Sequence, residues 1–172
     1  MARKKGEAMK KIIAIILLLL LMPTGSPSQT NEPRDSLRGL RAVYVRILPI
    51  QKDAQTDGLS ATQIQMAVEA QLRNAGIRVH TSPDLADGSA SLTVVIDTIK
   101  HPQGPYIYSV TVSLVQEVHL ARIEKRETFA AETWSKKALG LTTANKIASI
   151  QEPLREKVSE FISDYFAANP KT

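Results

Sequence analysis

Cysteine is absent from this 172-residue chain, and its absence excludes several kinds of chemistry. Thiol nucleophiles and zinc–thiolate sites both need a cysteine sulfur, so neither is present. A domain of this size can fold without disulfides when its hydrophobic core is large enough. Bacterial lipoproteins usually carry their lipid on a cysteine, so we do not expect a mature lipoprotein.

Recognisable catalytic and metal-binding motifs are also missing. The sequence contains no HExxH, no G-x-S-x-G, no P-loop and no G-x-G-x-x-G. The segment DAQTDG at 53–58 resembles the start of a calcium loop, but Gln55 and Ile64 stand at its third and twelfth positions, where Asp or Asn and a bidentate Glu are typical. We therefore expect no metal, no cofactor and no catalytic residue. The histidines have no metal-ligand spacing either: His80, His101 and His119.

One long hydrophobic run is present, within KKIIAIILLLLLMPTGSPSQT at 10–30. Its unbroken apolar part, Ile12–Met22, has eleven residues, whereas a membrane-spanning helix needs about 20. Two lysines before it and small residues after it are typical of a secretory signal peptide. We predict a signal peptide over 1–28, cleaved after Ser28, and a periplasmic or secreted product. An uncleaved membrane anchor is the alternative.

The formal net charge of +5 belongs mostly to this leader. Residues 1–28 hold five basic residues and one acidic residue, so that 17 of the 22 basic and 16 of the 17 acidic residues remain beyond it. Non-specific binding to nucleic acid needs several clustered cations. With a net charge of +1 left after residue 28, we expect no nucleic-acid partner.

The rest of the chain predicts a flexible tether over 29–37 and a single α/β domain over 38–170. Alternating apolar residues predict strands, and Ser60 with Gln63 forms a capping box before a helix that ends at Gly76. A second helix follows Thr142 or Thr143, and Pro153 predicts a kink or restart near Ser149. The segment 51–58 is expected to be a loop. The strands are expected at 42–50, 77–81, 91–99, 106–120 and 128–137.

This order, β-α-β-β-β-β-α, predicts an α/β (α+β) fold. With both helices on one face of a mixed sheet of about five strands, it forms a two-layer sandwich. The opposite face of the 106–120 strand is polar and faces solvent or a partner.

Three groups of residues are candidates for an interaction surface. The first is the polar face of the fourth strand, with Ser109, Thr111 and Ser113; the second is the basic segment with Arg38, Arg41 and Arg46. The third is Trp134, which is out of phase with its strand and is either exposed or turned inward by a β-bulge. We expect a non-enzymatic binding module that meets a membrane only through its signal peptide, with an envelope protein or ligand as its partner.

Two alternatives remain. The first is a small hydrolase or carbohydrate-active enzyme using the carboxylates of Asp84, Asp87 or Asp97, which requires two of them to face each other across a cleft. The second is a small-molecule carrier with a cavity between helix and sheet.

Four segments, taken in order, are similar to a family of small exported bacterial proteins of unknown function: LRGLRAVYV, LRNAGIRV, AAETWS and FISDYFAANP. The similarity extends from about residue 37 to residue 170. It implies export and carries no activity or site residue to transfer. The order of elements also resembles the small α/β modules of envelope proteins, such as the TolB amino-terminal domain or CsgG-like assemblies, at the level of fold alone.

Overall fold

The computed structural model describes residues 33–82, 89–102, 104–123 and 127–170. The predicted signal peptide over 1–28 and the first residues of the predicted tether lie outside these ranges. No helix within them is long and apolar enough to cross a membrane.

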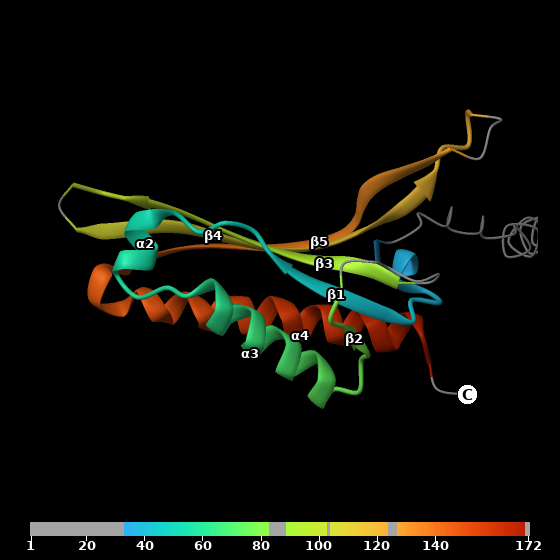
Figure 1. The fold of residues 1–172 in the computed structure, drawn as a ribbon, viewed down its shortest axis with the longest axis horizontal. Helices are drawn as coiled ribbons and strands as arrows, with labels where there is room; N and C mark the ends of the chain where they lie inside the picture. Colours follow the sequence, from blue (N-terminus) through green and yellow to red (C-terminus); the bar gives the residue numbers. More distant parts are fainter. Residues whose placement is uncertain (1–32, 83–88, 103, 124–126, 171–172) are drawn as a thin grey trace, which may run out of the picture. The chain divides into compact units, whose positions relative to one another are not determined.

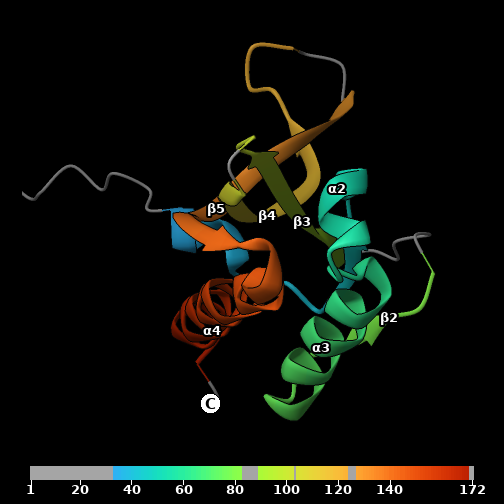
Figure 2. The ribbon, with the colours of Figure 1, turned by 90° about the vertical axis from the view of Figure 1, so that its left-hand side faces the viewer.

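The described chain forms one mixed sheet with two main helices on one face (Figure 1 and Figure 2). The sheet order is β2-β1-β3-β4-β5, parallel between β1 and its two neighbours and antiparallel from β3 to β5. This confirms the predicted α+β fold. The strands are β1 Ala42–Ile47, β2 Val79–His80, β3 Ser89–Lys100, β4 Pro105–His119 and β5 Thr128–Thr143; the helices are α3 Ala61–Asn74 and α4 Gln151–Ala168.

Local signals in the sequence account for the ends of α3. The Ser60 hydroxyl accepts a hydrogen bond from the backbone amide of Gln63 at 3.4 Å, which confirms the predicted N-cap. Gly76 has a φ of 86°, a left-handed conformation that is cheap only for glycine. Directly after it, Ile77 is buried and its amide donates to the Leu72 carbonyl at 3.0 Å, as expected for this type of helix end.

The carboxy-terminal helix restarts close to Ser149, as predicted from Pro153. Residues Ala144–Ile150 form the 3-10 helix η2, and α4 begins at Gln151. Pro153 lies in the first turn of α4, where backbone amides have no intrahelical partner and proline costs little.

Residues 51–58 are not the loop that we expected. Lys52–Thr56 forms the short helix α2, in which Ala54 is fully buried. The Gln55 amide group donates to the Ile50 carbonyl at 2.6 Å. Burial of Ala54 and this contact favour helix over the turn that the local composition predicts.

The predicted tether is also too long at its carboxyl end. Pro33–Leu37 forms the 3-10 helix η1, and Leu37 is fully buried. Hydrogen bonds from the Asn169 side chain explain why this segment is folded. Its amide group donates to the Leu37 carbonyl at 2.8 Å, and its carbonyl oxygen accepts from the Gly39 backbone amide at 2.7 Å. The Tyr165 hydroxyl donates to the Leu40 carbonyl at 3.1 Å. The two ends of the described chain therefore hold each other.

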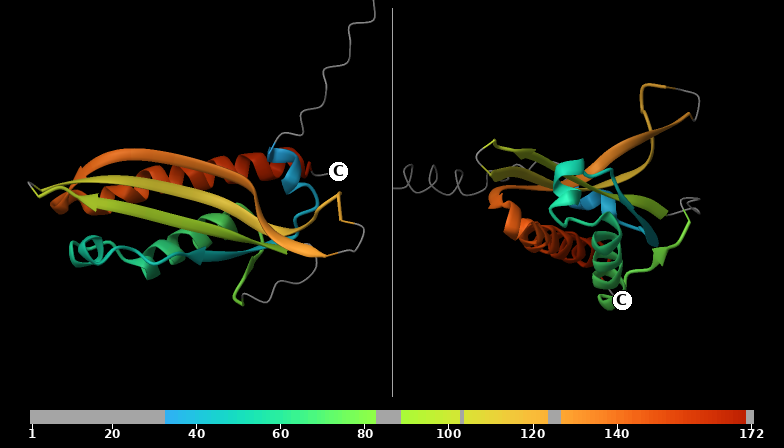
Figure 3. Two further views of the ribbon diagram at one scale, coloured as in Figure 1. Left: turned by 90° about the horizontal axis from the view of Figure 1, so that it is seen from above. Right: turned by 60° about the vertical axis from the view of Figure 1, so that its left-hand side comes forward.

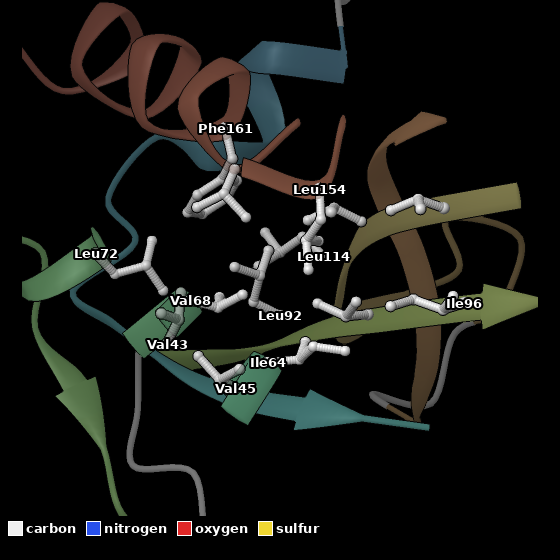
Figure 4. Close-up of a cluster of buried hydrophobic side chains, with 14 of the residues drawn as sticks. Val43, Val45, Ile64, Val68, Leu72, Leu92, Ile96, Leu114, Leu154 and Phe161 are labelled. Atoms are coloured by element: carbon white, nitrogen blue, oxygen red, sulfur yellow. The ribbon is translucent and has the colours of Figure 1, made fainter. Parts of the chain in front are cut away.

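The hydrophobic core lies between the sheet and the two helices (Figure 4). One stripe of α3 and one stripe of α4 bury apolar side chains against alternate residues of the strands, as the periodicity of the sequence predicts. The buried stripe residues are Ile64, Val68 and Leu72 on α3, and Leu154, Val158 and Phe161 on α4.

A β-bulge in β5 settles the orientation of Trp134. Leu114 pairs with Trp134, whereas the next residue of β4, Val115, pairs with Glu132. Thr133 is therefore an extra residue, and it shifts the inward phase of the strand by one. As a result, Trp134 points into the core, which confirms the second of the two orientations considered.

Candidate interaction surface

The face of the sheet that carries no helix is here called the open face. On β3, β4 and the second half of β5 it is formed by odd-numbered residues, because the even-numbered ones make the core. Ser109 and Thr111 are half-buried on this face, which is the face predicted for them from the alternation of the strand. Ser113 is only 4% exposed, so its expected place on an exposed surface is wrong: its short side chain lies between Thr93 and Ser135 in the middle of the sheet.

The three predicted arginines do not form one cluster. Arg38 follows η1 and makes an exposed ion pair with Asp35 at 3.5 Å, and Arg41 is exposed just before β1. Arg46 is exposed on β1, beside Thr93 in the register. Of the three, Arg46 is therefore the one that shares the open face with Ser109 and Thr111.

Trp134 belongs to the core and not to an exposed surface, which corrects its place among the interaction residues. It is 2% exposed, and its ring meets Phe161 edge-on with centroids 5.2 Å apart and planes at 73°. The indole N–H donates to Asp164 Oδ2 at 2.9 Å. The bulge, a packed ring and a satisfied polar atom together explain why a single tryptophan is buried here.

The exposed hydrophobic residues of the open face were missed by sequence reasoning. Ile99 lies opposite Ile107, which lies opposite Leu141, and Leu139 is next along β5. Their exposed fractions run from 52% to 75%. The sequence does indicate Ile99 and Ile107, because each is an apolar residue at a position of the alternating pattern that is otherwise polar. We call these four residues the apolar patch.

Gly140 separates the two leucines of the patch, and the packing of Tyr108 explains why a glycine stands at this position. A Cβ atom at this position would overlap the hydroxyl and ring of Tyr108, its partner across the strands. The Tyr108 ring thus packs on the glycine backbone from the helix side, an arrangement that compensates for the missing side chain of a glycine in a strand.

Of the three carboxylates proposed for catalysis, Asp97 is the one that lies within the described residues. Asp97 is exposed on the open face. One of its carboxylate oxygens lies 3.5 Å from the side-chain amide nitrogen of Gln51, and the other lies 3.5 Å from the Ser109 hydroxyl. Asp84 and Asp87 lie outside the described residues. Within the described ranges, no group of three His, Asp or Glu side chains is placed to hold a metal ion.

A cluster of titratable groups that the sequence did not indicate joins the end of α2 to the β3–β4 hairpin. The Tyr106 hydroxyl donates to Asp57 Oδ2 at 2.5 Å, and Lys100 Nζ donates to the same oxygen at 2.7 Å. The ammonium also lies 5.3 Å from the centroid of the Tyr106 ring, within reach of a cation–π interaction.

The electrostatics of this cluster are those of a structural contact. The hydrogen bond from Lys100, followed by that from Tyr106, lowers the pKa of the Asp57 carboxyl. The same bond to Asp57 raises the pKa of the Lys100 ammonium, and burial raises the pKa of the Tyr106 phenol. All three groups are thereby held in their ordinary charge states at neutral pH, whereas a general base or nucleophile needs a pKa moved toward neutrality.

The cluster predicts a dependence of stability on pH. Because the pKa of Asp57 is lower in the folded protein than its ordinary value of 3.8, the unfolded chain binds the proton more readily. The resulting stabilisation is present above about pH 4 and is lost as pH falls through the folded pKa. Urea denaturation should therefore show Asp57→Asn to be less stable than the wild type at about pH 6, with a smaller difference at about pH 3. A difference that is constant over this range would contradict the charged contact.

A groove of about 390 Å³ lies between α3 and α4, whereas the carrier alternative expected a cavity between helix and sheet. Apolar side chains such as Ile64, Val68 and Leu154 form most of its walls. Gln71 crosses it, with its amide group donating to the Arg155 carbonyl at 3.0 Å and to the Ser159 hydroxyl at 2.9 Å. These bonds tie the two helices together.

Comparison with known proteins gives no family for this chain. No protein-family model matches it, and no curated protein is significantly similar. Among solved structures, a minor lipoprotein from Acinetobacter baumannii matches with 10% sequence identity and a TM-score of 0.29, over 75% of this chain and 93% of that one. At this level the match assigns neither family nor function, so the resemblance drawn from the four sequence segments stays a prediction.

Proposed function

We propose that this protein is an exported, non-enzymatic binding module of the cell envelope that contacts a partner protein through its open sheet face. The leader supports export, because a short apolar run between lysines and small residues is typical of a signal peptide. The partner we expect is an envelope protein with an apolar surface of its own.

The observation that carries the proposal is the apolar patch. Four large aliphatic side chains lie next to one another on three strands, and each is at least half exposed. Single exposed apolar residues are common, but adjacent ones surrounded by polar side chains mark interaction sites. The neighbouring residues on the same face are polar: Asp97, Ser109 and Lys137. This arrangement of an apolar centre and a polar rim is that of a protein interface.

A photoreactive amino acid in place of Ile107 tests the proposal in the host cell. On irradiation, it should form a covalent adduct with an envelope protein. The matched control is the same substitution at Met66, which is 66% exposed but lies on α3, away from the open face. In an Ile99→Ser background the adduct from position 107 should fall about tenfold, since central apolar side chains dominate interface energies. Equal labelling from positions 107 and 66, or no adduct from either, would contradict the proposal.

A further inference from the structure

The outer edge of β5 is the second feature of the sheet that has no explained role. β5 is 16 residues long and is the last strand in the sheet order, so in the described part of the chain no strand pairs with its outer side. Such an edge presents backbone N–H and C=O groups that can pair with another strand. The first half of β5 is flanked by η1, whose Ser36 hydroxyl donates to the Thr133 carbonyl at 3.1 Å. In the left panel of Figure 3, the half leading to η2 forms the outer rim of the sheet.

This free half has a sequence that is complementary to itself when run antiparallel. It reads Lys136-Lys137-Ala138-Leu139-Gly140-Leu141-Thr142-Thr143. If two copies are aligned about Gly140, Leu139 of each copy lies opposite Leu141 of the other, and Lys137 lies opposite Thr143. We propose that two copies of this chain associate by antiparallel pairing of their β5 strands, centred on Gly140, to give one continuous sheet.

Side chains on both faces of the join favour this register. On the open face, the four leucines of the two copies would form cross-strand pairs, which stabilise antiparallel sheets. On the helix side the residues are small, with Ala138 opposite Thr142 and Gly140 opposite itself. A register centred on Lys137 would place that lysine opposite its own copy, and like charges in this position are unfavourable. Lysines on an edge strand commonly oppose unwanted pairing, and here they restrict the permitted register.

The association would also enlarge the binding surface. Ile99 and Ile107 of one copy, the four leucines at the join, and the two isoleucines of the other copy would form one apolar band across the open face. The isologous pairing is closed by a two-fold axis and needs no third copy. The inference does not rest on the proposed function, because the edge and its self-complementary sequence remain if the patch has no envelope partner.

Cysteine pairing tests the register, since the natural chain has no cysteine to interfere. Leu139→Cys and Leu141→Cys proteins are purified separately and oxidised mildly, alone and as a mixture. The mixture should form a covalent dimer readily and each protein alone only slowly, because residue 139 faces residue 141 of the other copy. Ile99→Cys, two strands from the join, should form none. Faster dimer formation by Leu139→Cys alone than by the mixture would overturn the Gly140 register.

Sedimentation of the wild-type protein tests the association itself. The wild type should sediment with twice the chain mass, and Leu139→Glu should weaken the association about tenfold or more, since it places a charge among the paired leucines. The control Ile99→Glu should leave the association unchanged. A wild-type protein that stays monomeric at every concentration would overturn the proposal. If the protein does not associate but position 107 still labels an envelope protein, the proposed function stands without the dimer. If the protein associates but position 107 labels no envelope protein, the dimer stands without the proposed function.

Discussion

Replacing Trp134 with alanine should lower the free energy of unfolding by about 3–5 kcal/mol, the range for a buried aromatic side chain cut back to a methyl group. The ring is 2% exposed and meets Phe161 edge-on at 5.2 Å. Alanine would leave a cavity between β5 and α4 and would also remove the donor that satisfies Asp164. Urea denaturation followed by circular dichroism measures the change.

Two further variants separate the contributions of the ring and the hydrogen bond. Trp134→Phe keeps an aromatic ring in the core and should cost clearly less than Trp134→Ala. Asp164→Ala leaves the buried indole N–H without its acceptor, at an expected cost of about 1–3 kcal/mol. If Trp134→Ala changed stability by no more than a surface substitution does, within about 0.5 kcal/mol, the bulge and the inward orientation would both be wrong.

Leu37→Ala should cost about 2–5 kcal/mol, a large effect for a residue in a segment that the sequence assigns to a tether. Leu37 is fully buried, and its carbonyl accepts from Asn169 at the end of α4. Shortening its side chain removes apolar contacts at the point where the two ends of the domain meet. The neighbouring exposed residue provides the control: Arg38→Ala should stay within about 0.5 kcal/mol of the wild type. Thermal or urea unfolding of the three proteins measures the difference.

Truncation gives an independent measure of where the folded domain begins. Removal of residues 1–32 should leave stability almost unchanged, whereas removal through Leu37 should cost at least as much as Leu37→Ala, because η1 is then lost. Equal stability of the two truncated proteins would show that η1 contributes nothing and would restore the predicted boundary at residue 38.

Features of the fold that depend on near neighbours in the sequence could be predicted. Strict alternation from Tyr106 to Leu114 predicted the core face of β4, and the capping box at Ser60 and the glycine at position 76 predicted both ends of α3. In these cases the deciding hydrogen bonds and periodicities lie within a few residues, so the sequence contains the whole signal.

Features that depend on distant partners could not be predicted. The order of η1 depends on Asn169, 132 residues away, and nothing in residues 33–37 indicates that contact. The predicted strand ended at Lys137, with Thr142 or Thr143 expected as the cap of the next helix, but pairing with β4 and the cover of the Tyr108 ring extend β5 to Thr143. The exposed leucines were missed for this reason, and the inward turn of Trp134 remained open because a bulge is visible only once both strands are aligned.

The two outer edges of the sheet differ greatly in length, and this difference limits the size of any assembly. β2 contributes two residues, whereas β5 contributes 16. A short edge strand offers too few backbone groups to recruit another chain, so growth by strand addition is possible at one side alone. Once that side is occupied by a second copy, no equivalent edge remains. The same asymmetry would end the assembly at two chains and protect the protein from open-ended, fibre-like polymerisation.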